Sequence, residues 1–573
     1  MIDRWKLGIL FIALLFTTPV IVIFSSIFYG SGDAWEHLVD TVLADYVSNS
    51  LILMAGVSIG TLTMGISTAW LTSLCEFPGR KIFQWALLLP LAVPAYIIAY
   101  TYTGMLDFTG PLQSMLRDVF GWQARDYWFP EIRSIGGAIA MLSLVLYPYV
   151  YLLTRAAFLE QSSVTLEASR SLGKGAWQSF FKVALPMARP AIITGLSLAL
   201  METLADFGTV EYFGVVTFTT GIFRTWFGLG DATAASQLAS MLLVFVFFLI
   251  MMERYSRRQA RFHQQIGRQA HARRIQLTSS RAWLAFTACL LPLVLGFILP
   301  FGQLVLWTIE TAEEMINRDF FELIFNSLLL AIATSFIALI LALYMGYGQR
   351  LHNTALMKVM VRIASMGYAV PGTVIAIGVV IPFAWLDNSM DDFSRSQFDY
   401  STGLIFSGTL FALVFAYLVR FLAVSVGTVE SSLGKIKPSM DDAARSMGIK
   451  PLQVLKRIHI PLMRTSLLTA LLLVFVDILK ELPATLLLRP FNFNTLAVRA
   501  YELAADERLA DASSAAITIV LVGILPVILL SLSITKNSYK SAPAAAAPEQ
   551  TSADNSLLDN NMELKHADGI IKP

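Results

Sequence analysis

The sequence contains the stretch Glu167-Ala168-Ser169-Arg170-Ser171-Leu172-Gly173, and further along the chain the similar stretch Asp442-Ala443-Ala444-Arg445-Ser446-Met447-Gly448. In both copies a proline follows the glycine after thirteen residues, Pro186 in the first and Pro461 in the second. We call Glu167–Pro186 and Asp442–Pro461 the first and second repeat segments. A spacing that is kept in both copies indicates one structural unit that occurs twice.

Two further landmarks extend this repeat towards the start of each copy. The triplet Asn49-Ser50-Leu51 recurs as Asn326-Ser327-Leu328, and Ala92-Val93-Pro94 recurs as Ala369-Val370-Pro371. These two triplets recur at the same offset along the chain, and that offset differs only slightly from the offset between the repeat segments. We therefore predict two equivalent halves that together cover almost the whole chain.

The composition places these halves in a membrane. Of the 573 residues, 56% are hydrophobic and 14% are charged, whereas soluble domains carry about 25% charged residues. The net charge of +2 gives no reason to expect a nucleic-acid partner. Only Cys75 and Cys289 are present, which argues against a disulfide framework or a cysteine metal site.

Apolar runs of roughly 20 residues are long enough to cross the hydrocarbon core as helices. We therefore predict an all-α fold, a polytopic membrane helical bundle of about 12 transmembrane helices in two tandem six-helix halves. An even number of spans in each half gives both halves the same orientation. The predicted spans are 7–29, 49–74, 82–104, 134–158, 187–205, 234–252, 283–309, 326–347, 360–385, 403–427, 463–480 and 513–535.

The predicted organisation is a first half over 1–254, a basic linker over 255–282, a second half over 283–536 and a disordered tail over 537–573. Positive residues accumulate in cytoplasmic loops, so the linker and both termini are predicted to be cytoplasmic, with the linker also contacting anionic lipid. The arginines behind this prediction are Arg254, Arg257, Arg258, Arg261, Arg268, Arg273, Arg274 and Arg281.

Each repeat segment has the features of a short helix, a turn and a second helix that leads into the next span. An acidic residue near a helix start suits the positive end of the helix dipole, small residues let a partner surface approach, and the glycine permits a turn. The apolar residues after the glycine would anchor a partner: Trp177, Phe180 and Phe181 in the first copy, and Leu452, Val454 and Leu455 in the second. A single copy would fit an amphipathic loop on the membrane equally well, but two matched copies favour docking to another protein.

The repeat segments resemble the EAA motif of ABC-type importer permeases, and depart from it mildly at Ser169, Asp442 and Ile460. The resemblance implies that each segment forms the helix that couples the permease to a cytoplasmic ATPase. It also implies that two permease domains are fused in one chain of the bacterial inner membrane, with two ATPase copies and an extracytoplasmic solute-binding protein as partners. The coupling residues would be Glu167, Ala168, Gly173 and Pro186, with Asp442, Ala443, Gly448 and Pro461.

The chain lacks a Walker A pattern, since neither Gly173-Lys174-Gly175 nor Gly434-Lys435-Ile436 has the required Ser or Thr. We therefore predict that it is not an enzyme and that ATP is hydrolysed on a separate subunit. No cofactor and no resident metal site is predicted. An ion-coupled secondary transporter would also have twelve spans but would not explain the two repeat segments.

Four carboxylates mark the ends of two predicted spans. Glu202 and Asp206 are one helical turn apart, and Asp477 and Glu481 occupy the same positions in the second copy of the repeat. Ionisable groups at membrane depth are costly unless they are paired or hydrated, so these residues either line a translocation pathway between the halves or pack between helices. Lys480 would neutralise part of the second pair.

The stretch from Asp206 to Trp226 resembles ferric-iron importer permeases. By that resemblance Glu211 and Tyr212 would offer oxygen ligands, which suit a hard cation. Permeases for thiamine and polyamines share the same repeat segments, so thiamine, a polyamine or another small solute remains the alternative substrate.

Overall fold

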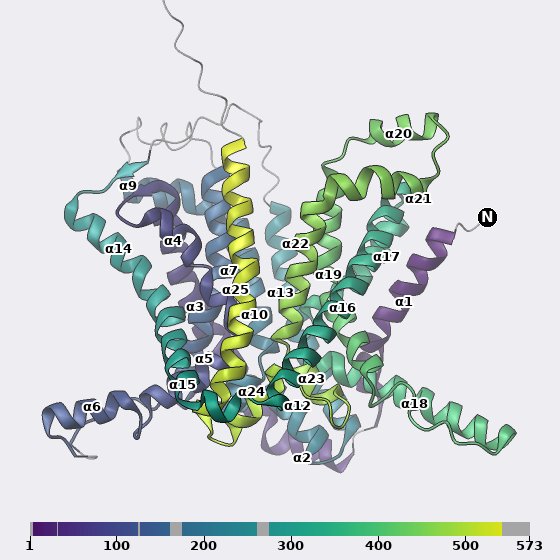
Figure 1. Cartoon of the computed structure of the whole chain (residues 1–573), viewed down its shortest axis with the longest axis horizontal. Coiled ribbons are helices and arrows are strands. Elements are labelled where there is room, and N and C mark those ends of the chain that lie inside the picture. The colour runs from purple at the N-terminus through teal and green to yellow at the C-terminus, as the bar shows by residue number, and fades with distance from the viewer. Residues whose placement is uncertain are drawn as a thin grey trace, which may run out of the picture. The chain divides into compact units, whose positions relative to one another are not determined.

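The structure is a computed structural model that describes residues 4–30, 32–123, 126–160, 173, 175–259 and 274–540. Within these residues eleven helices are long and apolar enough to cross a membrane, and a bent pair of helices makes twelve if it is counted as one span. The prediction of a polytopic helical bundle is therefore confirmed (Figure 1).

The first half of the sequence forms α1 (Arg4–Ser25), η1 (Ser26–Phe28), α2 (Asp33–Thr41), α3 (Leu43–Leu74), β1 (Cys75–Glu76), α4 (Arg80–Ala86), η2 (Leu89–Ala92), α5 (Ala95–Leu106), α6 (Pro111–Phe120), α7 (Ile135–Glu160), α9 (Ala176–Ser179), η3 (Phe180–Ala184), α10 (Leu185–Ala205), α11 (Gly208–Tyr212), α12 (Phe218–Phe227) and α13 (Ala232–Gln259).

The second half forms β2 (Ile275–Gln276), α14 (Ser279–Leu293), η4 (Val294–Ile298), α15 (Leu299–Met315), α16 (Arg318–Leu351), α17 (Ala355–Ala364), η5 (Met366–Ala369), α18 (Gly372–Phe398), α19 (Leu410–Gly434), α20 (Pro438–Ser446), α21 (Pro451–Val454), η6 (Leu455–His459), α22 (Ile460–Leu479), α23 (Pro483–Leu488), α24 (Leu496–Ala505) and α25 (Leu509–Lys540).

The third predicted span of each half is broken rather than continuous. Val93 and Val370 are extended (ψ 121° and 128°), and each is followed by a proline that starts the next helix. A residue before proline is disfavoured in the α conformation, so Pro94 ends η2 and Pro371 ends η5. The two halves of the first break are bent by 91°. The repeated Ala-Val-Pro triplet thus marks these helix breaks.

The prolines of the repeat segments lie in the first turns of α10 and α22, and each of these helices continues a helical run that begins before it. A π-helical turn precedes each of them, η3 before Pro186 and η6 before Pro461. A proline ring clashes with the carbonyl four residues earlier, and the wider π turn relieves that clash. Helix η4 before Pro300 follows the same rule.

The hydrophobic packing does not follow the two halves of the sequence. One buried cluster joins α1 and α13 of the first half to α16, α18, α19 and α22 of the second. The other joins α3, α5, α7 and α10 of the first half to α14 and α15 of the second. The first helix of each half therefore packs on the other half: α1 contacts α17 and α18, and α14 contacts α3 and α4 (Figure 1). The two packing clusters therefore do not coincide with the two halves of the repeat.

Close helix contacts fix α10 relative to α7. At Gly195 a Cβ atom would come within 2.9 Å of the Tyr149 carbonyl oxygen and the Val150 Cα atom. Only a glycine allows this approach. It sets α10 against α7 and positions the residues at the end of α10.

The linker region is partly structured. Helix α13 continues to Gln259, and α14 begins at Ser279. Between them, β2 pairs in parallel with β1, with Cys75 opposite Ile275. The Glu76 carboxylate also lies 3.5 Å from Arg274 and 3.2 Å from Arg80. At the other end of the chain the larger compact unit closes at Ile528, and α25 continues to Lys540.

Candidate translocation pathway and coupling segments

A cavity lies where α10 of the first half and α22 of the second half end. Residues of both halves line it, as the repeat predicts for a site on the axis that relates them. They include Val93, Pro94, Tyr96, Leu142, Val145, Leu146, Tyr149, Glu202, Asp206, Gly208, Tyr368, Arg420, Phe421, Asp477, Lys480 and Glu481. The cavity thus brings together four of the six predicted pathway residues, Glu202, Asp206, Asp477 and Glu481.

Asp206 stands at the break between α10 and α11. Its backbone is extended (ψ 132°), which ends α10. Its carboxylate accepts hydrogen bonds from the Thr209 hydroxyl (2.9 Å) and the Val210 amide (3.1 Å). Both donors belong to the first turn of α11, so Asp206 satisfies one of the free amides at its start and places its negative charge at the positive end of the dipole.

Glu481 plays the matching role in the second half. Its carboxylate accepts a hydrogen bond from the Ala484 amide (3.2 Å) at the start of α23. It also lies 3.2 Å from the Arg420 guanidinium, and both side chains are buried, with 5% and 8% exposed. Gly372 presses against this pair, because a Cβ atom there would collide with Arg420 Nη1 and Glu481 Oε1.

The remaining two carboxylates differ in their partners. Asp477 lies 3.0 Å from the Lys480 ammonium, as predicted for the second pair. Glu202 has neither a hydrogen bond nor an ion pair within the described part of the chain, and it is half-buried. The cavity therefore holds four carboxylates against two basic side chains, Lys480 and Arg420, and the excess of two negative charges favours a cationic occupant.

Glu211 and Tyr212 are not among the residues that line this cavity. The Glu211 carboxylate lies 3.1 Å from the Arg224 guanidinium. The Tyr212 hydroxyl accepts a hydrogen bond from Arg133 (3.4 Å), and the same guanidinium lies 5.1 Å from the centre of the Tyr212 ring. Both predicted ligands thus engage basic side chains on α12 and on the segment before α7.

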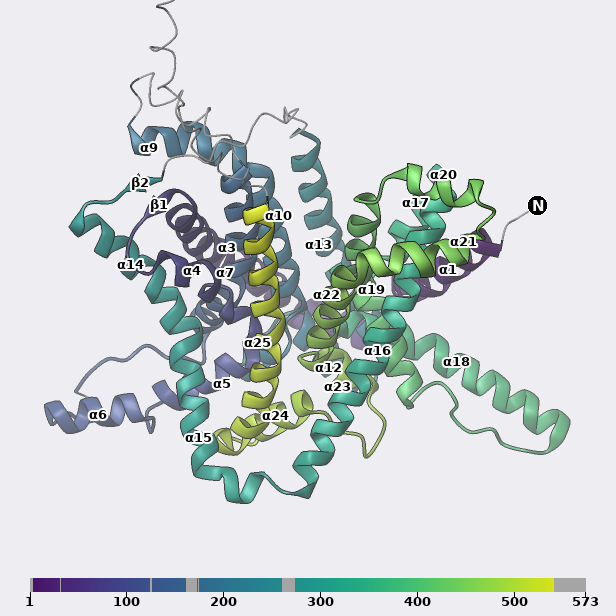
Figure 2. The same cartoon turned by 45° about the horizontal axis from the view of Figure 1, so that its top comes forward.

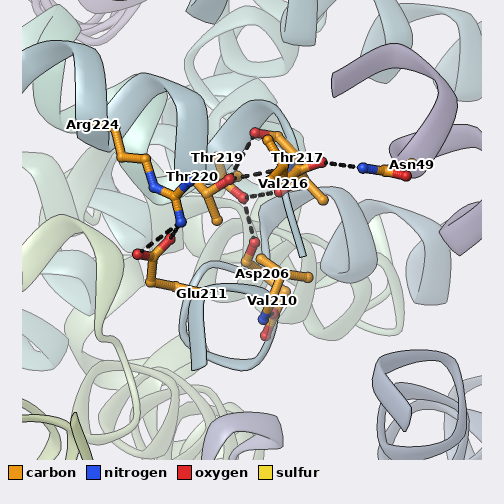
Figure 3. Close-up of polar contacts among 9 residues, drawn as sticks. All are labelled: Asn49, Asp206, Val210, Glu211, Val216, Thr217, Thr219, Thr220 and Arg224. Atoms are coloured by element: carbon orange, nitrogen blue, oxygen red, sulfur yellow. Dashed lines mark hydrogen bonds and ion pairs between the residues drawn. The ribbon is translucent and has the colours of Figure 1, made fainter. Parts of the chain in front are cut away.

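The loops after α11 and α23 are attached to the second span of their own halves. The Asn49 amide donates to the Val216 carbonyl (2.9 Å; Figure 3), and the Asn326 amide donates to the Asn494 carbonyl (3.5 Å). This pairing gives a physical role to the repeated Asn-Ser-Leu triplet. Asn49 and Asn326 thus hold the loops that follow α11 and α23.

The second repeat segment forms the predicted helix, turn and helix. Helix α20 contains Asp442 and Ala443, and Gly448 follows it with φ +73°, a left-handed conformation that favours glycine. Met447 and Leu452 expose apolar side chains on this segment, and Met440 exposes its side chain on α20 just before it. Val454 and Leu455 are buried instead, so they hold the segment to the protein and are not free to anchor a partner.

The first repeat segment is described only in part. Glu167 and Ala168 lie outside the described residues. Gly173 has φ +76°, which matches Gly448 and supports the same turn. Phe181 is exposed and Phe180 is half-buried, and Pro186 lies in the first turn of α10 just as Pro461 does in α22.

Two arginines that contact acidic residues at or next to the predicted sites, Arg420 and Arg350, were not identified from the sequence. Arg420 lies within the apolar run of α19, where a charged side chain is costly and therefore rare. That position could have marked it as a functional candidate. Arg350, at the end of α16, donates to Asp441 of α20 (2.8 Å), directly before the second repeat segment. Its signal was weaker, because basic residues are common at span ends.

No group of three or more His, Cys, Asp or Glu side chains in the described ranges is arranged to hold a metal ion. Three of the four cavity carboxylates are held by Lys480, Arg420 or the start of a helix. Such a site can attract a cation and let it pass, since it does not enclose the ion in a fixed ligand set.

Comparison with known proteins supports this description. Residues 6–261 and 337–536 match the family described as binding-protein-dependent transport system inner membrane component. The chain is 25% identical over 492 residues to the Fe(3+)-transport system permease protein FbpB 2 of Haemophilus influenzae, covering 85% of this chain and 90% of the relative. It is 23% identical to the ferric transport system permease protein FbpB of Actinobacillus pleuropneumoniae, covering 85% and 72%. A shorter match, 33% identical over 28% of this chain and 66% of the relative, is to the molybdenum transport system permease protein ModB of Escherichia coli.

Proposed function

The chain belongs to the family of binding-protein-dependent transport system inner membrane components, and on that premise we propose that it is the membrane-spanning permease subunit of an ATP-driven importer for ferric iron. The family matches both halves, so the chain carries two permease domains in one polypeptide. Two of the relatives that match most of its length are permeases of ferric transport systems.

We infer the class of substrate from the charge of the cavity between α10 and α22. Its four carboxylates exceed its two basic side chains by two, and Glu202 has no partner within the described residues. An oxyanion such as molybdate would meet net repulsion there, whereas a cation gains favourable electrostatic energy. The cavity therefore supports a cationic substrate over the anionic one that the shorter molybdenum match would suggest.

The proposed mechanism is alternating access. Closure of an ATPase pair would move the two repeat segments, and the helices that continue from them, α10 and α22, end at the cavity carboxylates. Each repeat segment is joined to its span by an unbroken helical run, Phe180–Ala205 in the first half and Pro451–Leu479 in the second. A rigid rod of this kind can carry a displacement from the cytoplasmic face to the cavity.

The partners follow from the same proposal. Two copies of a cytoplasmic ABC ATPase bind the repeat segments, and an extracytoplasmic binding protein delivers the iron to the opposite face. This places the chain in the inner membrane of a bacterium, with the basic linker and both termini in the cytoplasm.

The test is uptake by proteoliposomes that contain the chain and the ATPase that copurifies with it. Radioactive Fe(III) carried by the copurifying binding protein should enter in an ATP-dependent manner, while molybdate should not. Uptake that proceeds without ATP but with a proton or sodium gradient would refute the proposal in favour of a secondary transporter. Selective ATP-driven uptake of thiamine or putrescine would support the ATP-driven importer but refute ferric iron as its substrate.

A further inference from the structure

The second repeat segment is attached to the rest of the protein by a cluster of polar side chains at the end of α16. Three nitrogen atoms of Arg350 donate to three different points: Nε to Asp441 (2.8 Å), Nη1 to the Leu433 carbonyl (2.5 Å) and Nη2 to the Ile436 carbonyl (2.9 Å). One guanidinium thus ties the end of α19, the connection after it and α20 together.

Two more contacts complete this cluster. His459 of η6 is fully buried, and its Nε2 atom lies 2.7 Å from the other oxygen of Asp441. One turn before Arg350, the Tyr347 hydroxyl donates to the Pro451 carbonyl at the start of α21 (2.8 Å), and its ring packs edge-on against His459. We call Tyr347, Arg350, Asp441 and His459 the α16 junction. Both views place α20 and α21 beside the end of α16 (Figures 1 and 2).

The aligned positions of the first half hold residues that cannot form such a junction. At the repeat offsets, Ser73 stands in place of Arg350, Leu166 in place of Asp441 and Ala184 in place of His459. Trp70 takes the position of Tyr347 and packs on Phe180 of η3 with ring centres 4.7 Å apart. At this position the first repeat segment is therefore held to α3 by aromatic packing, which has little directional preference compared with charge-assisted hydrogen bonds.

We propose that Arg350 is a positioning residue of the coupling machinery, which fixes the second repeat segment rigidly to α16. The junction reaches further through α1, because Trp5 stacks on Tyr344 of α16 (4.6 Å) and packs against Tyr347. A movement of the second repeat segment is thereby passed to α16 and to the first helix of the other half. This inference rests on the proposed function for its coupling role, but the junction itself is a property of the chain alone.

The first measurement is hydrogen exchange of the α20 amides in the purified chain. Arg350→Met and Asp441→Asn should each raise exchange in α20 by at least about tenfold, because the helix loses its attachment. The matched control Ser73→Ala, at the aligned position in the first half, should leave α20 unchanged. Arg350→Lys keeps the charge but not the three-point fork, so it should give an intermediate effect. Unchanged exchange in both Arg350→Met and Asp441→Asn would overturn the junction.

The second measurement is the ratio of iron taken up to ATP hydrolysed by the assembled transporter. Arg350→Met should lower this ratio several-fold at equal amounts of inserted protein and bound ATPase, while Ser73→Ala keeps the wild-type ratio. If α20 exchange rises and the ratio stays at the wild-type value, the positioning role is wrong although the junction exists. If the wild type itself shows no ATP-driven uptake, the proposed function is refuted. The hydrogen-exchange measurement then still decides whether the α16 junction exists.

Discussion

Replacing Glu481 by Gln removes one charge from the buried pair with Arg420. The side chains are 5% and 8% exposed and their charged atoms are 3.2 Å apart. Glutamine keeps the shape and can still accept the Ala484 amide, so the substitution isolates the charge. The Arg420 guanidinium stays buried without a counter-ion in direct contact.

The size of the effect follows from this geometry. At a separation of 3.2 Å and an effective dielectric constant of about 20, the attraction that is lost amounts to about 5 kcal/mol before solvation is counted. Measured losses for one partner of a buried pair are about 3–5 kcal/mol. Asp206→Asn is the matched control, because Asp206 occupies the aligned position and pairs only with neutral donors. It should cost less than about 1 kcal/mol, because Asn accepts the same hydrogen bonds as Asp at a helix start and only the attraction between charge and helix dipole is lost.

The assay is thermal unfolding of the purified chain in one detergent, followed by the loss of helical circular dichroism. Glu481→Gln should unfold at a clearly lower temperature than Asp206→Asn. Adding Arg420→Gln to Glu481→Gln should recover most of the loss, since the lone buried charge disappears. Equal midpoints for Glu481→Gln and Asp206→Asn, or no recovery in the double variant, would refute the assignment of a stabilising buried ion pair.

Three further predictions concern single positions. Glu202→Gln should leave thermal stability unchanged, because no described partner is lost, but should lower iron uptake; an unchanged uptake rate would return Glu202 to a packing role. Gly448→Ala and Gly173→Ala should each add about 1–2 kcal/mol of backbone strain at φ +73° and +76° and reduce ATP-driven uptake. No atom of the described residues lies within 4 Å of the added Cβ, so the effect would come from the backbone alone. Wild-type uptake in both variants would argue against a required left-handed turn. Gly372→Ala should separate Arg420 from Glu481 and destabilise the chain as Glu481→Gln does; a wild-type unfolding midpoint would show that the pair tolerates the methyl group.

The sequence predicted the elements that depend on repetition. The offset between the two repeat segments places Glu202 and Asp477 at equivalent positions, and a shared axis brings equivalent positions together, so their common cavity could be foreseen. The same reasoning predicted the paired glycine turns at Gly173 and Gly448. Hydropathy predicted the number of spans, because spanning helices require long apolar runs.

The sequence could not predict contacts that depend on the local path of the chain. Glu211 and Tyr212 follow the break at Asp206, and the short helix α11 turns them towards Arg224 and Arg133 instead of the cavity. Arg420 is separated from Glu481 by 61 residues, so nothing near it in the sequence reveals its partner. The sequence also could not predict that α1 and α14 each pack against helices of the other half, because hydropathy shows that a helix is apolar but not which helix it contacts.

The packing of α1 and α14 on the opposite halves determines when each helix can find its partners during synthesis. Helix α1 precedes all the helices against which it packs, and two of them, α17 and α18, begin only at Ala355 and Gly372. During translation part of its apolar surface therefore stays covered by lipid until more than half of the polypeptide has been inserted. A product that stops in the basic linker would leave both clusters unfinished. Keeping the two domains on one messenger and one polypeptide guarantees that each obtains its complement, in equal amount and from the same ribosome.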